Sequence, residues 1–114
     1  MKDRVALEAA IARVEGAELL TGNRHKLYTS HAEGIGIKLP NWHYPVVINP
    51  ETGEAKYDNY NGGWGKQELL DALVQGYAVE KTRMEAIQAG RRVEEELDEA
   101  TGDIRVKLYD YVTA

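Results

Sequence analysis

The chain has 114 residues, no cysteine and a formal net charge of −5. This length suits a single domain over residues 1–114 with one modest core. The lack of cysteine excludes disulfides, thiolate metal sites and a cysteine nucleophile, and it favours a cytoplasmic protein, because small secreted domains usually need disulfide bridges.

The charge is unevenly distributed along the chain. Residues 1–66 hold eight acidic and eight basic side chains, whereas residues 67–114 hold eleven acidic and six basic ones. An acidic second half argues against duplex nucleic acid as a partner, but a small nucleotide needs only a few local donors. No apolar stretch is long enough to cross a bilayer, and the charged residues directly after Met1 are untypical of a signal peptide, so we expect no membrane insertion.

A helix is expected first. Asp3 can cap its start, and apolar residues recur at helical spacing at Leu7, Ala10, Ile11 and Val14. Its other faces are polar, so we expect this short helix to lie on a sheet.

Strand-like segments separated by turn residues come next, at 17–21, 25–31, 34–39, 44–49 and 55–60. The stretch GIGIKL alternates glycine with apolar residues, which indicates a close approach by another backbone or a ligand on the glycine side. Residues 49–54, NPETGE, are typical of a turn, so the last two segments should form a hairpin.

A long helix and two strands should complete the chain. Leu70, Leu73, Tyr77 and Met84 share one helical face between about residues 66 and 89, and Gly76 could bend or split this helix. Residues 91–97 and 103–112 alternate apolar with charged side chains around a hairpin loop. The sequence therefore predicts an α+β domain: a single-layer, mostly antiparallel sheet with one short N-terminal helix and one long helix packed on one face.

The stretch YNGGWGKQELL at 60–70 has two possible interpretations. It is not a nucleoside-triphosphatase loop, because Tyr60 replaces the first glycine and Gln67 replaces the metal-binding hydroxyl. Lys66 and free amides at a helix start could still bind a phosphate. Alternatively, the glycines only form a turn and Trp64 fills the core.

Aromatic residues gather in the middle of a chain that has no phenylalanine. They provide a stacking surface for a base or a protein partner, or they form the core. The predicted ligand- or partner-binding residues are Trp42, Tyr44, Tyr57, Tyr60, Trp64 and Lys66.

Little else in the chain points to chemistry. His25, His31 and His43 lack the spacing of a metal site, and the acidic run at 94–99 is typical of a solvated strand face. We therefore predict no catalytic residues, no metal and no cofactor.

The second half resembles domain-of-unknown-function family 1257, which includes the plastid proteins called hypothetical chloroplast reading frame thirty-five. The stretches that carry the resemblance are YNGGWG, the helix with Gln75, Tyr77 and Ala78, and GDIRVKL. The resemblance implies a small soluble α+β protein with no established activity. Family members are similar to products found beside AAA-type ATPases, which implies an accessory role.

Two functions are consistent with these features. The first is a non-enzymatic accessory protein that acts through protein–protein contacts, with a protein partner or with itself. The alternative is a protein that binds a nucleotide or another small anion at the glycine-rich loop and the nearby aromatic residues.

Overall fold

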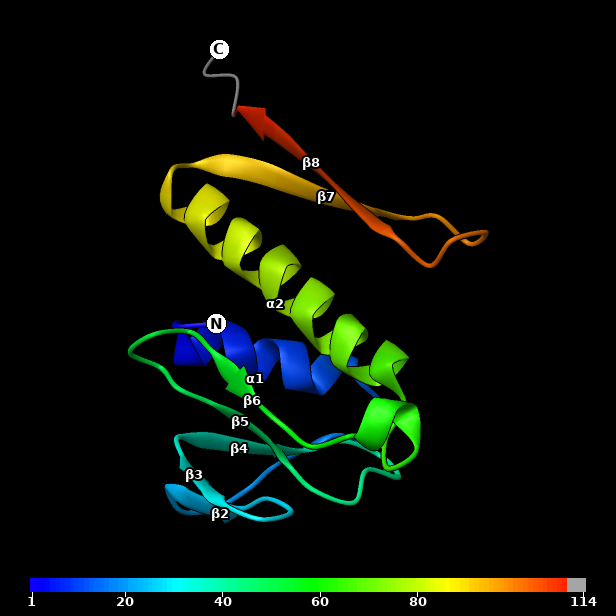
Figure 1. Ribbon diagram of the computed structural model, residues 1–114. Coiled ribbons are helices and arrows are strands. Elements are labelled where there is room, and N and C mark those ends of the chain that lie inside the picture. Colours follow the sequence, from blue (N-terminus) through cyan, green and yellow to red (C-terminus); the bar gives the residue numbers. More distant parts are fainter. Residues whose placement is uncertain (111–114) are drawn as a thin grey trace.

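Two α-helices and eight strands make up residues 1–110, the part of the chain that the computed structural model describes (Figure 1). The helices are α1 (Arg4–Arg13) and α2 (Gln67–Gln88), and a short 3-10 helix, η1 (Tyr60–Gly62), precedes α2. The strands are β1 (Glu18–Leu19), β2 (Arg24–Lys26), β3 (His31–Glu33), β4 (Ile35–Lys38), β5 (Val46–Ile48), β6 (Ala55–Lys56), β7 (Arg91–Leu97) and β8 (Ile104–Asp110). The predicted α+β class, the two helices and the antiparallel pairing are confirmed. The last two residues of the strand predicted at 103–112 lie outside the described part.

The strands are divided among three antiparallel sheets, whereas the sequence predicted one layer. Four strands form a sheet in the order β1-β4-β5-β6, and β2–β3 and β7–β8 form two separate hairpins. The strands do not form the predicted single layer, because α2 lies between the last hairpin and the four-stranded sheet (Figure 1).

Both helices pack on one face of the four-stranded sheet. The Asp3 carboxylate accepts a hydrogen bond from the Ala6 amide at 3.1 Å and so caps α1 as predicted. The core contains the apolar stripe of α1, side chains of β4 and β5, and two leucines of α2, and its members include Leu7, Ile11, Ile37, Val46, Ile48, Leu70 and Leu73. Burial of this apolar surface is the main stabilising term for the fold.

The β2–β3 hairpin covers the opposite face of β4 and β5. Leu27 and Ala32 pack there against Val47, which explains why β5 is apolar on both sides. The His25 imidazole lies over Gly36, where an added Cβ would be only 2.5 Å from the ring. The close approach predicted from GIGIKL is therefore made within the protein, by the His25 ring at Gly36 and by the backbone of Ile48 at Gly34.

The prediction of one strand at 25–31 is wrong. The segment folds back on itself as β2 and β3, with the Leu27 amide donating to the Ser30 carbonyl at 2.8 Å. Neither Tyr28 nor Thr29 has a positive φ, so this turn does not need the glycine or asparagine that marks most tight hairpins.

α2 runs unbroken through Gly76, which neither bends nor splits it. Gly76 faces α1, where an added Cβ would lie 3.5 Å from the Ala10 side chain. Neither helix in the described part of the chain combines the length and apolarity needed to cross a bilayer.

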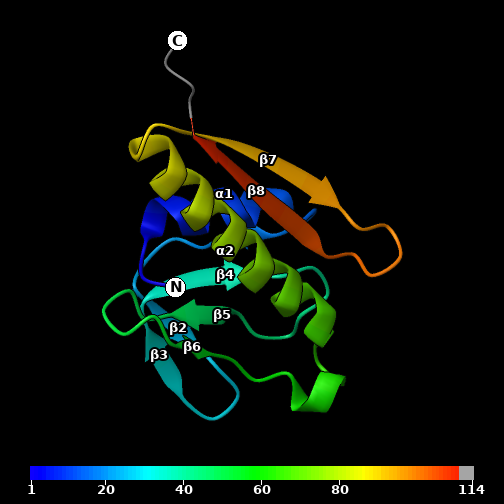
Figure 2. The ribbon, with the colours of Figure 1, turned by 90° about the horizontal axis from the view of Figure 1, so that it is seen from above.

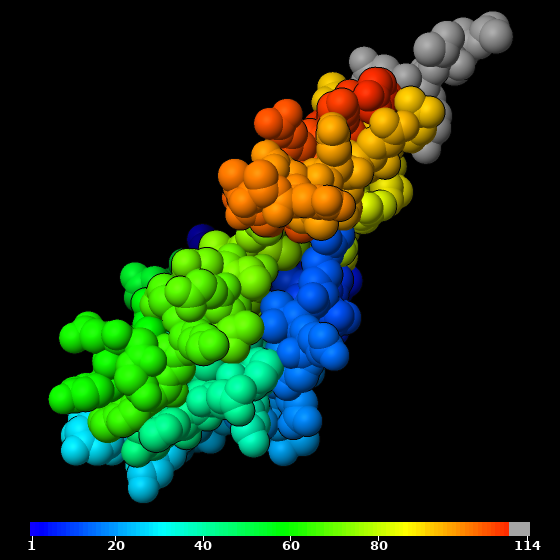
Figure 3. Space-filling model, turned by 90° about the vertical axis from the view of Figure 1, so that its right-hand side faces the viewer, coloured from blue at the N-terminus to red at the C-terminus, as the bar shows by residue number. Residues whose placement is uncertain are grey.

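The β7–β8 hairpin lies on the far side of α2 from the sheet (Figure 2). Polar contacts attach the hairpin to the two helices: the Glu95 carboxylate accepts hydrogen bonds from Arg13 of α1 and Arg83 of α2. The molecule is consequently elongated (Figure 3), with extents of 59 × 33 × 20 Å. Its radius of gyration is 15.8 Å, whereas about 13 Å is expected for a compact domain of this length.

Candidate functional site

Five aromatic rings from three loops gather at the end of the molecule opposite the β7–β8 hairpin. We call Tyr28, His43, Tyr44, Tyr60 and Trp64 the aromatic cluster. Tyr28 comes from the β2–β3 turn, His43 and Tyr44 from the β4–β5 connection, and Tyr60 and Trp64 from the segment that leads into α2.

Trp64 is the centre of this cluster. Tyr60 stacks on its indole with ring centroids 4.9 Å apart and planes at 24°, and His43 stacks at 5.9 Å and 15°. Tyr28 and Tyr44 meet the same indole at steeper angles, with centroids 4.8 and 5.8 Å away. These distances are typical of favourable aromatic pairs.

Hydrogen bonds hold the three loops together. The Tyr28 amide donates to Asp58 at 2.8 Å, which joins the β2–β3 turn to the loop before η1. The His43 amide donates to the Trp64 carbonyl at 2.9 Å. Tyr60 and Asn61 adopt the left-handed conformation, with φ of 47° and 51°, which costs free energy in residues other than glycine. The loops are therefore fixed in place by contacts from outside their own segments.

The cluster forms part of the protein surface. Tyr60 is 71% exposed and Tyr28 is 56% exposed, while Tyr44 and Trp64 are half-buried. Tyr44 also packs against the small core formed by Leu27, Ala32 and Val47. A rigid base therefore supports two exposed tyrosine rings.

The six predicted site residues fall into different environments. Tyr44, Tyr60 and Trp64 belong to the aromatic cluster. Trp42 is buried in the main core, where its ring lies against Gly65 and its Nε1 donates to the Lys66 carbonyl at 3.2 Å. Tyr57 packs edge-on against Trp42 at 5.9 Å, so it lies between the core and the surface.

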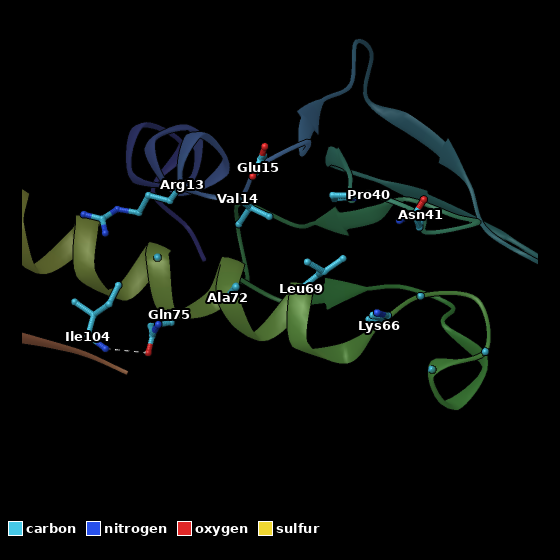
Figure 4. Close-up of a pocket in the computed structure, with 14 residues that line it drawn as sticks. Arg13, Val14, Glu15, Pro40, Asn41, Lys66, Leu69, Ala72, Gln75 and Ile104 are labelled. Carbon is cyan, nitrogen blue, oxygen red and sulfur yellow. Dashed lines mark hydrogen bonds between the residues drawn. The ribbon is translucent and has the colours of Figure 1, made fainter. Parts of the chain in front are cut away.

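Lys66 stands at the start of α2, where it is the N-cap residue and makes no capping bond with its side chain. Together with Gly62, Gly63 and Gly65 it lines a groove of about 930 Å³ that extends along α2 to Ile104 (Figure 4). Lys66 and Tyr57 also line a neighbouring groove of about 810 Å³ that includes Glu68. No member of the aromatic cluster lines either groove.

Two members of the cluster, Tyr28 and His43, were not predicted as site residues. Tyr28 was missed because the hairpin turn at 27–30 carries no glycine, asparagine or proline. His43 was considered only as a metal ligand. Its position beside Trp42 and Tyr44, within the aromatic-rich stretch, is the signal that would have included it.

No arrangement for metal binding is found within residues 1–110, where no three His, Asp or Glu side chains lie close enough to share an ion. Comparisons with protein-family models, with curated proteins and with solved structures find no match to this chain.

Proposed function

We propose that this protein is a non-enzymatic accessory protein that binds another protein through the aromatic cluster. The observation that carries this proposal is the convergence of three loops on Trp64, with Tyr28 and Tyr60 left exposed above it. Tyrosine and tryptophan supply much of the binding energy at protein interfaces, because they bury large areas and lose few rotamers. The resemblance to family 1257 stays a prediction, and the accessory role that it implies agrees with this proposal.

The fixed geometry of the cluster favours protein docking over stacking of a nucleobase. Trp64 already contacts four rings, so little of its π surface remains for a base. Loops that are held in place before binding lose less entropy when a partner docks.

The polar neighbours of the cluster indicate the chemistry of the partner. Lys26 and His31 face each other across the β2–β3 hairpin next to Tyr28. The nearby Asp58 carboxylate is engaged by the Tyr28 amide. A partner with an apolar side chain flanked by acidic residues would complement this surface, and its affinity should fall as salt is added.

A pair of matched double variants tests the proposal. Tyr28→Ser with Tyr60→Ser removes the exposed rings, and Val5→Ser with Ile87→Ser removes two apolar side chains of similar exposure elsewhere. Proteins captured from the native lysate on the wild-type chain would be purified and titrated against both variants. We expect the tyrosine variant to weaken binding by about tenfold or more, which is about 1.4 kcal/mol, and the control to change it little. Equal affinity for the two variants, or no captured partner that binds in the titration, would refute the proposal.

A second candidate, binding of a small anion, is favoured by the shared groove of Lys66 and the three glycines. Glu68 in the first turn of α2 opposes it, because an acidic side chain there competes for the positive end of the helix. Thermal shift with mono-, di- and cyclic nucleotides separates the candidates, since a ligand at a hundredfold its Kd adds about 2.7 kcal/mol to stability. A rise in Tm that is lost in Lys66→Gln would support the anion site, and no shift with any nucleotide would exclude these ligands.

A further inference from the structure

The β7–β8 hairpin is incompletely covered by the rest of the molecule. Its helix-facing side carries Val93, Glu95, Leu97, Ile104, Val106 and Leu108, and none of these side chains is buried. Leu97 is 61% exposed and Leu108 is 42% exposed. A single helix, about 10 Å wide, supports the pair of strands, so part of this apolar side remains open.

Both edges of the hairpin lack a neighbouring strand within residues 1–110. A two-stranded ribbon is only marginally stable by itself, and an open edge offers unpaired amides and carbonyls to any complementary strand. The edges differ in charge. β7 carries the acidic run Glu94, Glu95 and Glu96, whereas β8 alternates apolar Val106 and Leu108 with basic Arg105 and Lys107.

We propose that the open edge of β8 pairs in antiparallel fashion with β8 of a second copy of this chain. The product is a dimer whose hairpins form one four-stranded sheet in the order β7-β8-β8-β7. The pairing is isologous, so each copy closes the open edge of the other, and the assembly ends at two chains.

A register centred on Lys107 makes β8 complementary to itself. On the helix-facing side, Val106 of one copy then lies opposite Leu108 of the other, which covers the partly exposed leucine. On the outer side, Arg105 lies opposite Tyr109 of the second copy. The same kind of contact already exists within the chain, where the Arg92 guanidinium lies 4.6 Å from the centre of the Tyr109 ring.

The two Lys107 side chains meet at the two-fold axis in this register. Each ammonium group already lies 3.1 Å from Glu96 of its own chain, which offsets the repulsion between them. A register centred on Val106 instead places Arg105 opposite Lys107 twice, so cations face cations, and like charges opposite each other destabilise a sheet.

A second copy suits this edge better than the alternatives. Pairing of β7 with β7 brings two acidic runs together, and pairing of β7 with β8 of another chain leaves free edges and does not close. A specific interface buries about 800 Å² on each partner, roughly a tenth of the 7583 Å² surface of this chain. The hairpin lies far from the aromatic cluster, so this inference is independent of the proposed function (Figure 3).

Single cysteines test the geometry, because the chain has none of its own. Lys107→Cys places a thiol at the proposed two-fold axis. Glu94→Cys is the matched control, because Glu94 pairs with Lys107 across the hairpin and its side chain is 50% exposed, against 54% for Lys107. Under mild oxidation we expect Lys107→Cys to form disulfide-linked dimers about tenfold faster or more than Glu94→Cys, because only its thiols are held together before reaction.

Sedimentation of the wild-type chain provides the second measurement. It should show a mass of twice 12.8 kDa at high concentration, and Leu108→Lys, which adds a charge to the proposed interface, should shift the chain to the monomer. Comparison of the Tm of the two chains at low concentration checks that the variant is folded. A wild-type monomer at all concentrations, assemblies that grow beyond two chains, or cross-linking of Glu94→Cys as fast as Lys107→Cys would each overturn the proposal.

Discussion

The two ends of the molecule are stabilised by different kinds of interaction. In the body formed by α1, the four-stranded sheet and most of α2, apolar side chains are buried, and every buried apolar residue of the described chain lies between Ala6 and Ala86. Residues 91–97 and 104–109 of the β7–β8 hairpin contribute no buried side chain. The hairpin is anchored by Glu95 and by Gln75, whose side-chain Oε1 accepts a hydrogen bond from the Ile104 amide at 3.4 Å. Stability therefore resides in the body, and the hairpin should respond to pH and salt.

The anchor of the hairpin is a small charge network. The hydrogen bond from Arg13, with a smaller effect of the one from Arg83, holds the pKa of the Glu95 carboxyl below its usual value. The hydrogen bond to Glu95 in turn raises the pKa of Arg13. Arg13 also donates to Glu80 at 2.7 Å. One arginine of α1 thus links the hairpin to both helices.

The largest expected difference between the ends comes from shortening one leucine in each. Leu73→Ala removes a fully buried side chain and should lower the free energy of unfolding by about 3 kcal/mol, because it leaves a cavity in the core. Leu97→Ala, at an exposed position of the hairpin, should cost less than about 0.5 kcal/mol. Denaturant midpoints of the two variants measure this contrast, and equal losses would contradict it.

An intermediate effect is expected where the body meets the glycine-rich loop. A Cβ at position 65 would lie 2.4 Å from the Trp42 ring, so Gly65→Ala should cost roughly 2 kcal/mol through overpacking. In a chain that already carries Trp42→Leu, the added cost of Gly65→Ala should be much smaller, because the smaller side chain leaves room for the methyl group. A double-mutant cycle from thermal melts gives the coupling free energy between positions 42 and 65. Additive effects would show that the two side chains do not overlap sterically.

The smallest effect is expected at the hairpin anchor. Glu95→Gln should lower the free energy of unfolding by about 1 kcal/mol near neutral pH, which is the upper range for a partly exposed ion pair. Because the folded-state pKa of Glu95 is lowered, its contribution is complete above the ordinary value of 4.5 and disappears as the pH falls through the folded-state pKa. The wild type and the variant should therefore converge in stability at low pH.

Glu94→Gln is the control for this prediction. Glu94 is the sequence neighbour of Glu95 but lies on the outer side of the hairpin, where it forms a half-exposed pair with Arg92 at 3.4 Å and faces Lys107 on β8. Urea titrations across the pH range should find a change of less than about 0.5 kcal/mol for this variant. A difference between wild type and Glu95→Gln that persists unchanged in acid would mean that the network does not anchor the hairpin.

The body was largely predictable from the sequence because its signals are local. The helical spacing of Leu7, Ala10, Ile11 and Val14 and the cap at Asp3 define α1, and the alternation of Ile35 and Ile37 with glycine defines β4. The limits predicted for α2 agree with the structure within one residue.

The arrangement of the aromatic residues was less predictable, because it depends on contacts between distant segments. Trp64 lies within the glycine-rich loop and Trp42 packs against it. Yet Trp42 is buried against Gly65, and Trp64 supports the exposed rings. Tyr28 reaches Trp64 only because residues 25–31 turn back as a hairpin, and no glycine, asparagine or proline marks that turn.

Hydrogen exchange of the backbone amides, measured at a concentration where the chain is monomeric, tests the contrast between the two ends most directly. We predict that amides of β4 and β5 exchange only when the whole protein unfolds, whereas amides of β7 and β8 exchange through a local opening of lower free energy. Equal protection of the hairpin and the four-stranded sheet would contradict this account.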